Sequence, residues 1–278
     1  AGNGNFTQNT DIGLGNECYV SYEKMYQNRF AVLRKAFESY KAVRSESRVK
    51  LAAGLPEYKK YDNFIRDNAD WIENYALFMA VKEHFNGVVW SEWDEDIRLQ
   101  KREAMEQLQY ELADEAGFYA FLQMKFEEQW SALKSYANEK GIRIIGDIPI
   151  YVALDSADTW YHPELFQFDE NREPVAVAGC PPDGFSATGQ LWGNPLYQWE
   201  YHGKTGYQWW MRRMEYSFRL YDVVRVDHFR GFDEYYSIPA GSETAIHGTW
   251  EKGPGIEVFQ KMQEKFGKLD IIAEDLGF

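Results

Sequence analysis

The sequence predicts an α/β protein whose second half is built from parallel βα units. Short β-branched segments occur at residues 142–147, 222–227 and 269–274. A helical pattern precedes each of them, and long segments rich in Pro and Gly follow the first two. Because parallel strands need a crossover connection, this alternation of strand, long segment, helix and strand is typical of a parallel sheet.

The first half of the chain is predicted to be mostly helical. Three stretches carry apolar residues at helical intervals, and in the first of them the residues recur every three or four positions, which is the spacing of one helix face. A further stretch, residues 92–115, is strongly charged. One stretch opens near Asp62, a plausible cap, and another ends at Gly141, a good helix-ending residue. The apolar positions are Tyr22, Tyr26, Phe30, Leu33, Phe37 and Tyr40; Phe64, Trp71, Ile72, Tyr75, Phe78 and Met79; and Leu122, Phe126, Trp130, Leu133 and Ala137.

Pro, Gly and polar clusters divide the second half into further elements. The periodic segments between these clusters predict helices, and two short apolar runs around a polar turn predict a hairpin. The expected elements are helices at 207–220 and 254–266, a hairpin joining 166–168 to 175–177, and long ordered loops at 179–195 and 228–253.

The charge balance limits the partners of this protein. Its 278 residues include 30 Lys or Arg and 44 Asp or Glu, so the net charge is −14. Nucleic acids and anionic membranes need a basic surface, so neither is expected as a main partner. A neutral ligand such as a sugar remains open. No apolar run approaches the roughly 18 residues of a membrane span, and the first residues lack a signal-peptide pattern.

The two cysteines, Cys18 and Cys180, are too few for a disulfide framework and lack metal-ligand spacing. Thiols in a reducing compartment are the better interpretation, which favours a cytoplasmic location. The chain opens on Ala1 rather than Met, so it is expected to be processed or cut from something longer. The sequence leaves the oligomeric state open.

Acidic residues stand at the ends of the three predicted parallel strands: Asp147, Asp227 and Glu274. In a βα barrel the carboxyl ends of the strands and the loops after them build the active site, so three carboxylates at one edge form a specific arrangement. Because side chains alternate along a strand, Arg225 shares a face with Asp227. A cation there favours the ionised carboxylate, which a nucleophile requires.

Paired carboxylates are typical of glycoside cleavage, in which one attacks the anomeric carbon and the other protonates the leaving oxygen. Arg225 favours the attacking role for Asp227 and leaves the proton-donating role to Glu274. Aromatic side chains in or beside the two predicted loops suit the apolar faces of sugar rings. They are Phe185, Trp192, Tyr197, Trp199 and Phe229.

Each of these residues also has a purely structural interpretation. A strand-end acid can cap a loop, Arg225 can pair with any nearby acid, and His228 is more often a satisfied loop histidine than a catalyst. Trp209 and Trp210 fall in a predicted helix, where at least one is expected to pack. Composition and spacing alone therefore predict only an α/β protein with a possible acidic site.

Six motifs stand in order along the chain: GDIPIYV at 146–152, DSADTW at 155–160, AGCPPD at 178–183, QLWGNPLY at 190–197, RVDHFRGF at 225–232 and IAEDLG at 272–277. Together they closely resemble the 4-α-glucanotransferases of glycoside hydrolase family 77, the amylomaltases or disproportionating enzymes. Residues 76–85 also resemble that family's helical insertion. The resemblance covers most of the chain from about Tyr22 onward.

The resemblance implies a retaining transfer of α-1,4-glucan segments between maltooligosaccharides, with no metal or organic cofactor. It implies that Asp227 is the nucleophile and Glu274 the general acid/base. Gly184 departs from the aromatic residue often found there, so one stacking contact of that loop is not expected. Substrate-binding roles are implied for Arg225, His228, Asp147, Asp183, Trp192 and Asn194.

The resemblance also implies a partial (β/α)8 TIM barrel, about strands 3–5, with a helical insertion subdomain. Residues 1–115 are expected to be mainly the insertion, and residues 116–278 the central barrel. Long substrate loops are expected at 151–206 and 228–253. In the family the barrel begins earlier and a third catalytic acid lies on a later strand, so the chain is expected to be truncated at both ends and inactive alone.

Two other functions remain open at this point. An α-amylase-like hydrolase would form no chains longer than its substrate. A non-catalytic glucan-binding module would bind maltooligosaccharides without turning them over.

Overall fold

The computed structural model describes residues 21–50 and 56–274, which form two compact units. The first unit contains the described residues up to Ala76 together with Ala113–Phe126. The second contains Leu77–Leu112 and the described residues from Glu127 onward. This division differs from the boundary expected near residue 115, because the first unit takes part of the long helix after that point.

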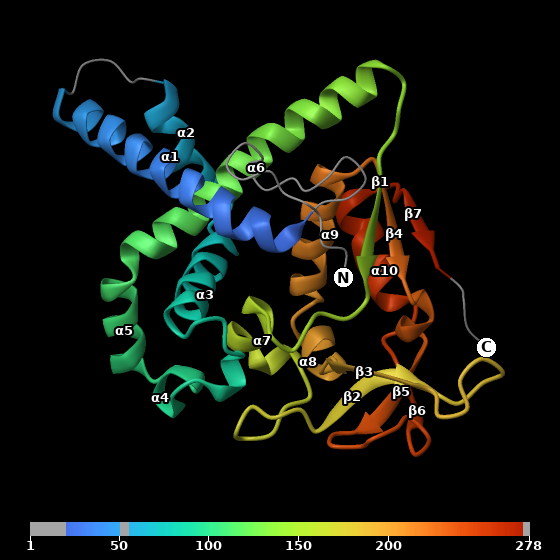
Figure 1. Ribbon diagram of the computed structural model, residues 1–278. Coiled ribbons are helices and arrows are strands. Elements are labelled where there is room, and N and C mark those ends of the chain that lie inside the picture. The colour runs from blue at the N-terminus through green and yellow to red at the C-terminus, as the bar shows by residue number, and fades with distance from the viewer. Residues whose placement is uncertain (1–20, 51–55, 275–278) are drawn as a thin grey trace. The chain divides into compact units, whose positions relative to one another are not determined.

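The helices and strands of the described residues follow one another as shown in Figure 1. The α-helices are α1 (Tyr22–Lys50), α2 (Pro56–Asp67), α3 (Ile72–His84), α4 (Glu95–Arg98), α5 (Arg102–Glu111), α6 (Ala113–Glu139), α7 (Ala157–Tyr161), α8 (Trp199–Lys204), α9 (Gln208–Leu220) and α10 (Glu257–Phe266). The 3-10 helices are η1 (Trp90–Glu92), η2 (Pro163–Leu165) and η3 (Phe229–Phe232). The strands are β1 (Ile145–Pro149), β2 (Ala176–Cys180), β3 (Gln190–Pro195), β4 (Val223–Asp227), β5 (Glu234–Pro239), β6 (Thr249–Lys252) and β7 (Ile271–Ala273).

Aromatic rings from α1 and α6 form the centre of the first unit. The Phe37 ring lies 5.7 Å from Phe118 and 5.4 Å from Phe121, and the Tyr40 ring lies 5.1 Å from Phe121. These contacts confirm the inner part of the apolar face predicted for the first helix. Tyr22, at the start of that face, is 70 % exposed, and the side chain of Tyr26 lies outside the described residues.

The helix predicted through residues 64–79 is divided in two, and its predicted opening at Asp62 is wrong. The division occurs at Asn68, which is 1 % exposed. Its side-chain amide donates to Phe64 O at 2.9 Å, while its Oδ1 accepts from Trp71 Nε1 at 3.2 Å. An Asn side chain that bonds to the local backbone competes with the helix, so α2 ends at Asp67 and α3 begins at Ile72.

The second unit contains a three-stranded parallel sheet in the order β1-β4-β7 (Figure 1). The three predicted parallel strands are thereby confirmed, as are the two helices between them, α9 and α10. The first strand lies later than predicted, at Ile145–Pro149, because the chain turns at Gly141, whose φ is 76°, and residues 142–144 have no regular structure. Asp147 is therefore in the middle of its strand rather than at the end.

An antiparallel sheet in the order β3-β2-β5-β6 replaces the two long loops predicted at 179–195 and 228–253. Its strands are short and interrupted by Gly and Pro, and β2 pairs with β5 about sixty residues later (Ala176↔Pro239). The segment expected as a 166–168/175–177 hairpin forms a short one: Phe168 bridges Pro174, and the Val175 N–H donates to Gln167 O at 3.0 Å. Phe166 forms a second antiparallel bridge, with Tyr197.

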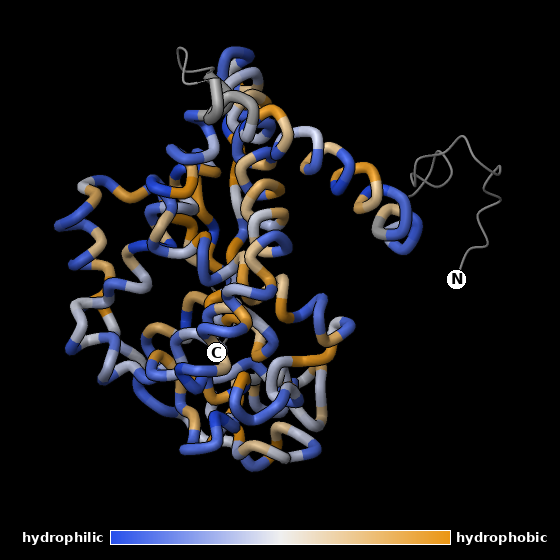
Figure 2. Tube along the Cα trace, turned by 90° about the vertical axis from the view of Figure 1, so that its left-hand side faces the viewer, coloured by the Kyte–Doolittle hydropathy of each residue, from blue (hydrophilic) through white to orange (hydrophobic). Residues whose placement is uncertain are grey.

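The core of the second unit lies between its helices and the parallel sheet. Trp210 from α9, Val224 from β4 and Leu196 after β3 are each 0 % exposed. Trp209 is 7 % exposed, so both tryptophans of the predicted helix pack inward. Hydrophilic and hydrophobic residues alternate at short intervals along the trace (Figure 2), and no helix among the described residues is long and apolar enough to cross a membrane.

Candidate active site

The register of the parallel sheet brings the predicted charged residues to its carboxyl edge. Asp147 on β1 lies opposite Arg225 on β4, and Pro149 lies opposite Asp227. Val226 pairs with Ala273, and the Glu274 N–H donates to Val226 O at 3.1 Å. Glu274 therefore continues β7 beside the end of β4, as the strand-end argument predicts.

Arg225 links two of the carboxylates. Its Nη1 donates to both carboxylate oxygens of Asp147 at 2.7 Å, and its Nη2 lies 3.2 Å from Asp227 Oδ1. The hydrogen bond to Asp147 is the main cause that raises the pKa of Arg225; burial opposes it, and the charges of Asp147, Asp227 and Glu274 add to the rise. The guanidinium thus joins Asp147 on β1 and Asp227 on β4 into one charged cluster.

Asp227 and Glu274 have different surroundings. The Asp227 side chain is 52 % exposed, whereas Glu274 as a residue is 9 % exposed. The backbone N–H of His228 donates to Glu274 Oε2 at 2.9 Å, and the N–H of Phe229 donates to Glu274 O at 3.2 Å. The two residues after Asp227 therefore fix both the side chain and the backbone of Glu274.

His228 joins this carboxylate pair to an aromatic side chain. Its backbone is left-handed (φ 51°), and the residue is 8 % exposed. The imidazole meets the Trp192 ring edge-to-face, with centroids 4.8 Å apart. Burial lowers the pKa of His228, although the nearby charges of Glu274 and Asp227 oppose the shift. The ring of His228 thus contacts Trp192 while its backbone N–H holds Glu274.

Strand β3 brings two more predicted residues to this region. Asn194 donates from Nδ2 to Val152 O at 2.8 Å, which ties β3 to the segment after β1. Trp192 Nε1 donates to Gln190 Oε1 at 3.0 Å. The strand is irregular between these two residues, because Gly193 has a φ of 77° and the register with β2 shifts here.

Asp183 closes a turn in the segment between β2 and β3. Its Oδ1 accepts from the N–H groups of Phe185 at 2.8 Å and Ser186 at 2.7 Å. Phe185, at the tip of this turn, is fully exposed. The structure gives this carboxylate a local structural partner, and a contact with substrate stays a prediction.

Two features of the site differ from the sequence interpretation. Tyr197, predicted as a sugar-facing ring, is 1 % exposed, and its hydroxyl donates to Ile150 O at 2.7 Å. It packs in the core because Trp199, Trp209 and Trp210 surround it. Tyr151, which the sequence did not single out, stacks on Tyr197 and lies 6.4 Å from Trp192. The one signal in the sequence for this contact with Tyr197 and Trp192 was the position of Tyr151 shortly after the predicted strand 142–147.

Metal ligands and a reactive thiol are two further kinds of group that the described residues could bring to the site. Within the described ranges, no three His, Cys, Asp or Glu side chains are grouped so that they could hold a metal ion. Burial raises the pKa of the half-buried Cys180 thiol. Cys18 lies outside the described residues.

The fold and the site together define an α/β protein with an acidic site at the carboxyl edge of a parallel sheet. The chain belongs to the 4-alpha-glucanotransferase family, glycoside hydrolase family 77, whose sequence model matches residues 4–278. It is 48 % identical over 260 residues to the 4-alpha-glucanotransferase of Streptococcus pneumoniae, covering 93 % of this chain and 49 % of that protein. It is 46 % identical over 258 residues to that of Thermus thermophilus, covering 93 % and 50 %.

Solved structures agree with this family. The amylomaltase from Streptococcus agalactiae in complex with acarbose superposes with a TM-score of 0.85 and 39 % identity, over 93 % of this chain and 50 % of that one. The amylomaltase from Corynebacterium glutamicum, at 20 % identity and a TM-score of 0.71, shares the fold over 93 % of this chain and 32 % of its own. The chain spans about half the length of these curated relatives.

Proposed function

We propose that the protein carrying this sequence is a 4-α-glucanotransferase that moves α-1,4-glucan segments between maltooligosaccharides with retention. One observation carries the proposal: Asp227 and Glu274 stand at the ends of adjacent parallel strands, linked through the His228 N–H, with Arg225 beside Asp227. Membership of the family supports the same activity. Two carboxylates facing one sugar are the groups that retaining glycoside cleavage needs.

In the first step, Asp227 attacks the anomeric carbon of the donor glucan. The bond between that carbon and the glycosidic oxygen breaks, and Glu274 gives its proton to the departing oxygen. The sugar is then bound to Asp227 as an ester, and the shortened glucan leaves. The positive charge of Arg225 keeps the carboxylate of Asp227 oriented and supports its role as nucleophile.

In the second step, the 4-hydroxyl of another glucan attacks the anomeric carbon of the ester and displaces the Asp227 carboxylate. Glu274 accepts the proton of that hydroxyl, and the retained α-linkage forms as the bond to Asp227 breaks. Transfer rather than hydrolysis requires that water compete poorly at the ester. The remaining roles that we propose are contacts with the bound sugar, by Arg225, His228, Asp147, Asp183, Trp192 and Asn194.

We further propose that β1, β4 and β7 are about strands 3–5 of a (β/α)8 barrel. Parallel order and intervening helices α9 and α10 support this placement. In this proposal residues 1–115 are mainly a helical insertion, residues 116–278 the central barrel, and the segments 151–206 and 228–253 its substrate-facing excursions. A cytoplasmic location and the absence of a cofactor stay predictions.

Maltotriose disproportionation by the full-length protein tests the proposed reaction. Wild type is expected to release glucose and to form chains longer than maltotriose, and Asp227→Asn or Glu274→Gln to reduce both by at least about a thousandfold. Glu139→Gln, at an exposed acid that ends α6, is the matched control and should behave as wild type. Glucose with no longer products would identify a hydrolase, and binding of maltoheptaose without any product a binding module. Full activity in either site variant would contradict the assignment.

A further inference from the structure

Residues 149–155 run from the last residue of β1 through a segment without regular structure, yet side chains hold this segment at several points. Arg213 on α9 donates to Pro149 O at 2.6 Å and to Ile150 O at 3.0 Å, and Asn194 donates to Val152 O. Farther along, Trp90 Nε1 donates to Leu154 O. Because most of these donors come from distant parts of the sequence, the segment 149–155 has one fixed course rather than many.

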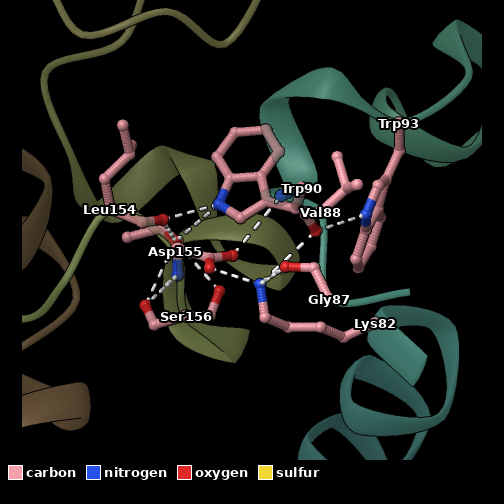
Figure 3. A network of polar contacts seen from close by, with 9 residues as sticks. Lys82, Gly87, Val88, Trp90, Trp93, Leu154, Asp155 and Ser156 are labelled. Atoms are coloured by element: carbon pink, nitrogen blue, oxygen red, sulfur yellow. Dashed lines mark hydrogen bonds and ion pairs between the residues drawn. The ribbon is translucent and has the colours of Figure 1, made fainter. Parts of the chain in front are cut away.

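Lys82, at the end of α3, closes this set of contacts (Figure 3). Its ammonium forms an ion pair with Asp155 Oδ2 and donates to Gly87 O at 3.1 Å and Val88 O at 3.4 Å. The other carboxylate oxygen of Asp155 accepts from the N–H of Trp90 at 3.4 Å. One cation thus joins the turn after α3 to the end of the segment that follows β1.

Trp90 makes the other half of this connection. The residue is 0 % exposed, and its indole Nε1 also lies 3.1 Å from Thr159 Oγ1 on α7. Trp90 is therefore fixed by the packing around it. The Lys82 and Asp155 side chains, in contrast, are 22 % and 30 % exposed. Loss of the ion pair should loosen the segment without unfolding the unit, since partly exposed ion pairs contribute little to stability.

The same segment leads directly to the candidate active site. Its first residue, Pro149, lies opposite Asp227 in the sheet register, two positions beyond Asp147. Tyr151 lies beside Trp192, and Trp192 meets His228 edge-to-face. A displacement of the segment would therefore reach the groups around Asp227 by two routes, one through the strand and one through the contacts between the Tyr151, Trp192 and His228 rings.

We propose that Lys82 is a positioning residue for the reaction at Asp227, acting through Asp155 to fix the segment 149–155. This inference rests on the proposed transferase function. Lys82 does not touch the reacting groups; its ammonium acts on the Asp155 carboxylate and on two carbonyl groups. Small displacements of a catalytic group reduce turnover strongly, so the expected consequence falls on kcat more than on KM.

Lys82→Met in the full-length protein tests this role, with maltotriose as substrate. Methionine keeps most of the apolar stem and removes the charge, so kcat is expected to fall at least tenfold while KM changes less than threefold. Lys82→Arg restores a cation and should recover kcat to within threefold of wild type. Asp155→Asn should resemble Lys82→Met, and the double variant should be no worse than either, because both changes break one interaction.

Lys265→Met is the matched control, since Lys265 forms an ion pair of 2.6 Å with Glu215 on the surface helices α9 and α10. It should leave kcat unchanged. Amide hydrogen exchange of residues 150–156 should speed up in Lys82→Met and not in Lys265→Met. An unchanged kcat in Lys82→Met, or a loss that Lys82→Arg does not recover, would overturn the positioning role. A wild-type protein without transferase products would instead contradict the proposed function.

Discussion

The two sheets of the second unit bring different chemistry to the same region. The parallel sheet supplies charge: Asp147, Arg225, Asp227 and Glu274 all stand on or at the ends of its strands. The antiparallel sheet supplies an aromatic ring and an amide, Trp192 and Asn194 on β3. Arg225 and Asp227 stand on β4, which is paired on both sides, whereas Trp192 and Asn194 stand on β3, which is paired on one side.

This difference suggests a division of work. Charges that drive bond cleavage need a fixed geometry, and a central strand paired on both sides provides it. Rings that hold a neutral sugar tolerate more variation, because stacking has no strict direction. We therefore expect changes on the parallel sheet to affect turnover, and changes on the antiparallel sheet to affect substrate binding or local stability.

After the two carboxylates themselves, the largest effect is expected for Arg225→Met, which removes the cation between Asp147 and Asp227. The kcat for maltotriose should fall about 10²- to 10³-fold, the usual size for loss of one electrostatic group at a reacting centre. Arg225→Lys keeps a charge without the two-pronged geometry and should lose about tenfold. Arg143→Met breaks an exposed ion pair with Asp270 before β7 and should leave kcat unchanged. A kcat of Arg225→Met within threefold of wild type would contradict the role proposed for the charges on the parallel sheet.

His202 tests the packing behind the antiparallel sheet. This residue of α8 is 0 % exposed among Tyr197, Trp199 and Trp209, and burial lowers its pKa to about 4. In the unfolded chain His202 binds a proton with a pKa near 6.5, whereas in the folded protein it does so only near pH 4. The free energy of unfolding is therefore fully maintained above pH 6.5 and falls as pH decreases toward 4, by up to about 3 kcal/mol.

Urea unfolding at several pH values measures this effect. His202→Gln keeps an amide that can donate to Leu165 O, as the His202 Nε2 does, and removes the titrating ring. The variant should lose the corresponding part of the pH dependence. An unchanged slope between pH 4 and 6.5 in His202→Gln would show that other groups cause the acid sensitivity.

Trp192→Ala is expected to weaken substrate binding more than turnover. Removal of the ring beside His228 should raise KM about tenfold, which corresponds to roughly 1.4 kcal/mol of lost contact. Trp192→Phe keeps an aromatic face and should stay within threefold. If kcat falls a hundredfold while KM is constant, the proposed division between the two sheets is wrong.

The smallest effect is expected at Asp183, in the turn between β2 and β3. Asp183→Ala removes the acceptor for two backbone N–H groups and should lower the free energy of unfolding by about 1 kcal/mol. Asp183→Asn keeps an oxygen in place and should change it by less than about 0.5 kcal/mol. Thermal unfolding of both variants measures the difference, and equal losses would show that the oxygen does not hold this turn.

The parallel sheet could be predicted because its signals are local. The β-branched segment that became β4 follows a periodic helix and ends in Asp227, and the helix before β7 ends at Gly267, whose φ is 73°. Side-chain alternation then places Arg225 and Asp227 on one face without knowledge of the fold. The partnership of Arg225 with Asp147 needed the register between β1 and β4, which no local pattern specifies.

The antiparallel sheet could not be predicted for the opposite reason. Four consecutive residues of β5, from Tyr235 to Ile238, are buried, so the strand lacks the alternation that marks a half-exposed strand. Its partner β2 lies about sixty residues earlier, and Gly and Pro on both sides favour a loop interpretation. Contacts such as the pair of Lys82 and Asp155 likewise join residues 73 positions apart.

The left-handed backbone at His228 limits how this site can be redesigned. A library that varies position 228 to change acceptor preference also varies a residue whose N–H holds Glu274. Gly, Asn and Asp adopt such a backbone at little cost, while Val, Ile and Thr strain it by about 1–2 kcal/mol. Variants with β-branched residues should therefore lose activity whatever their side chains offer the sugar, and screening effort is better spent on Trp192 or Asn194.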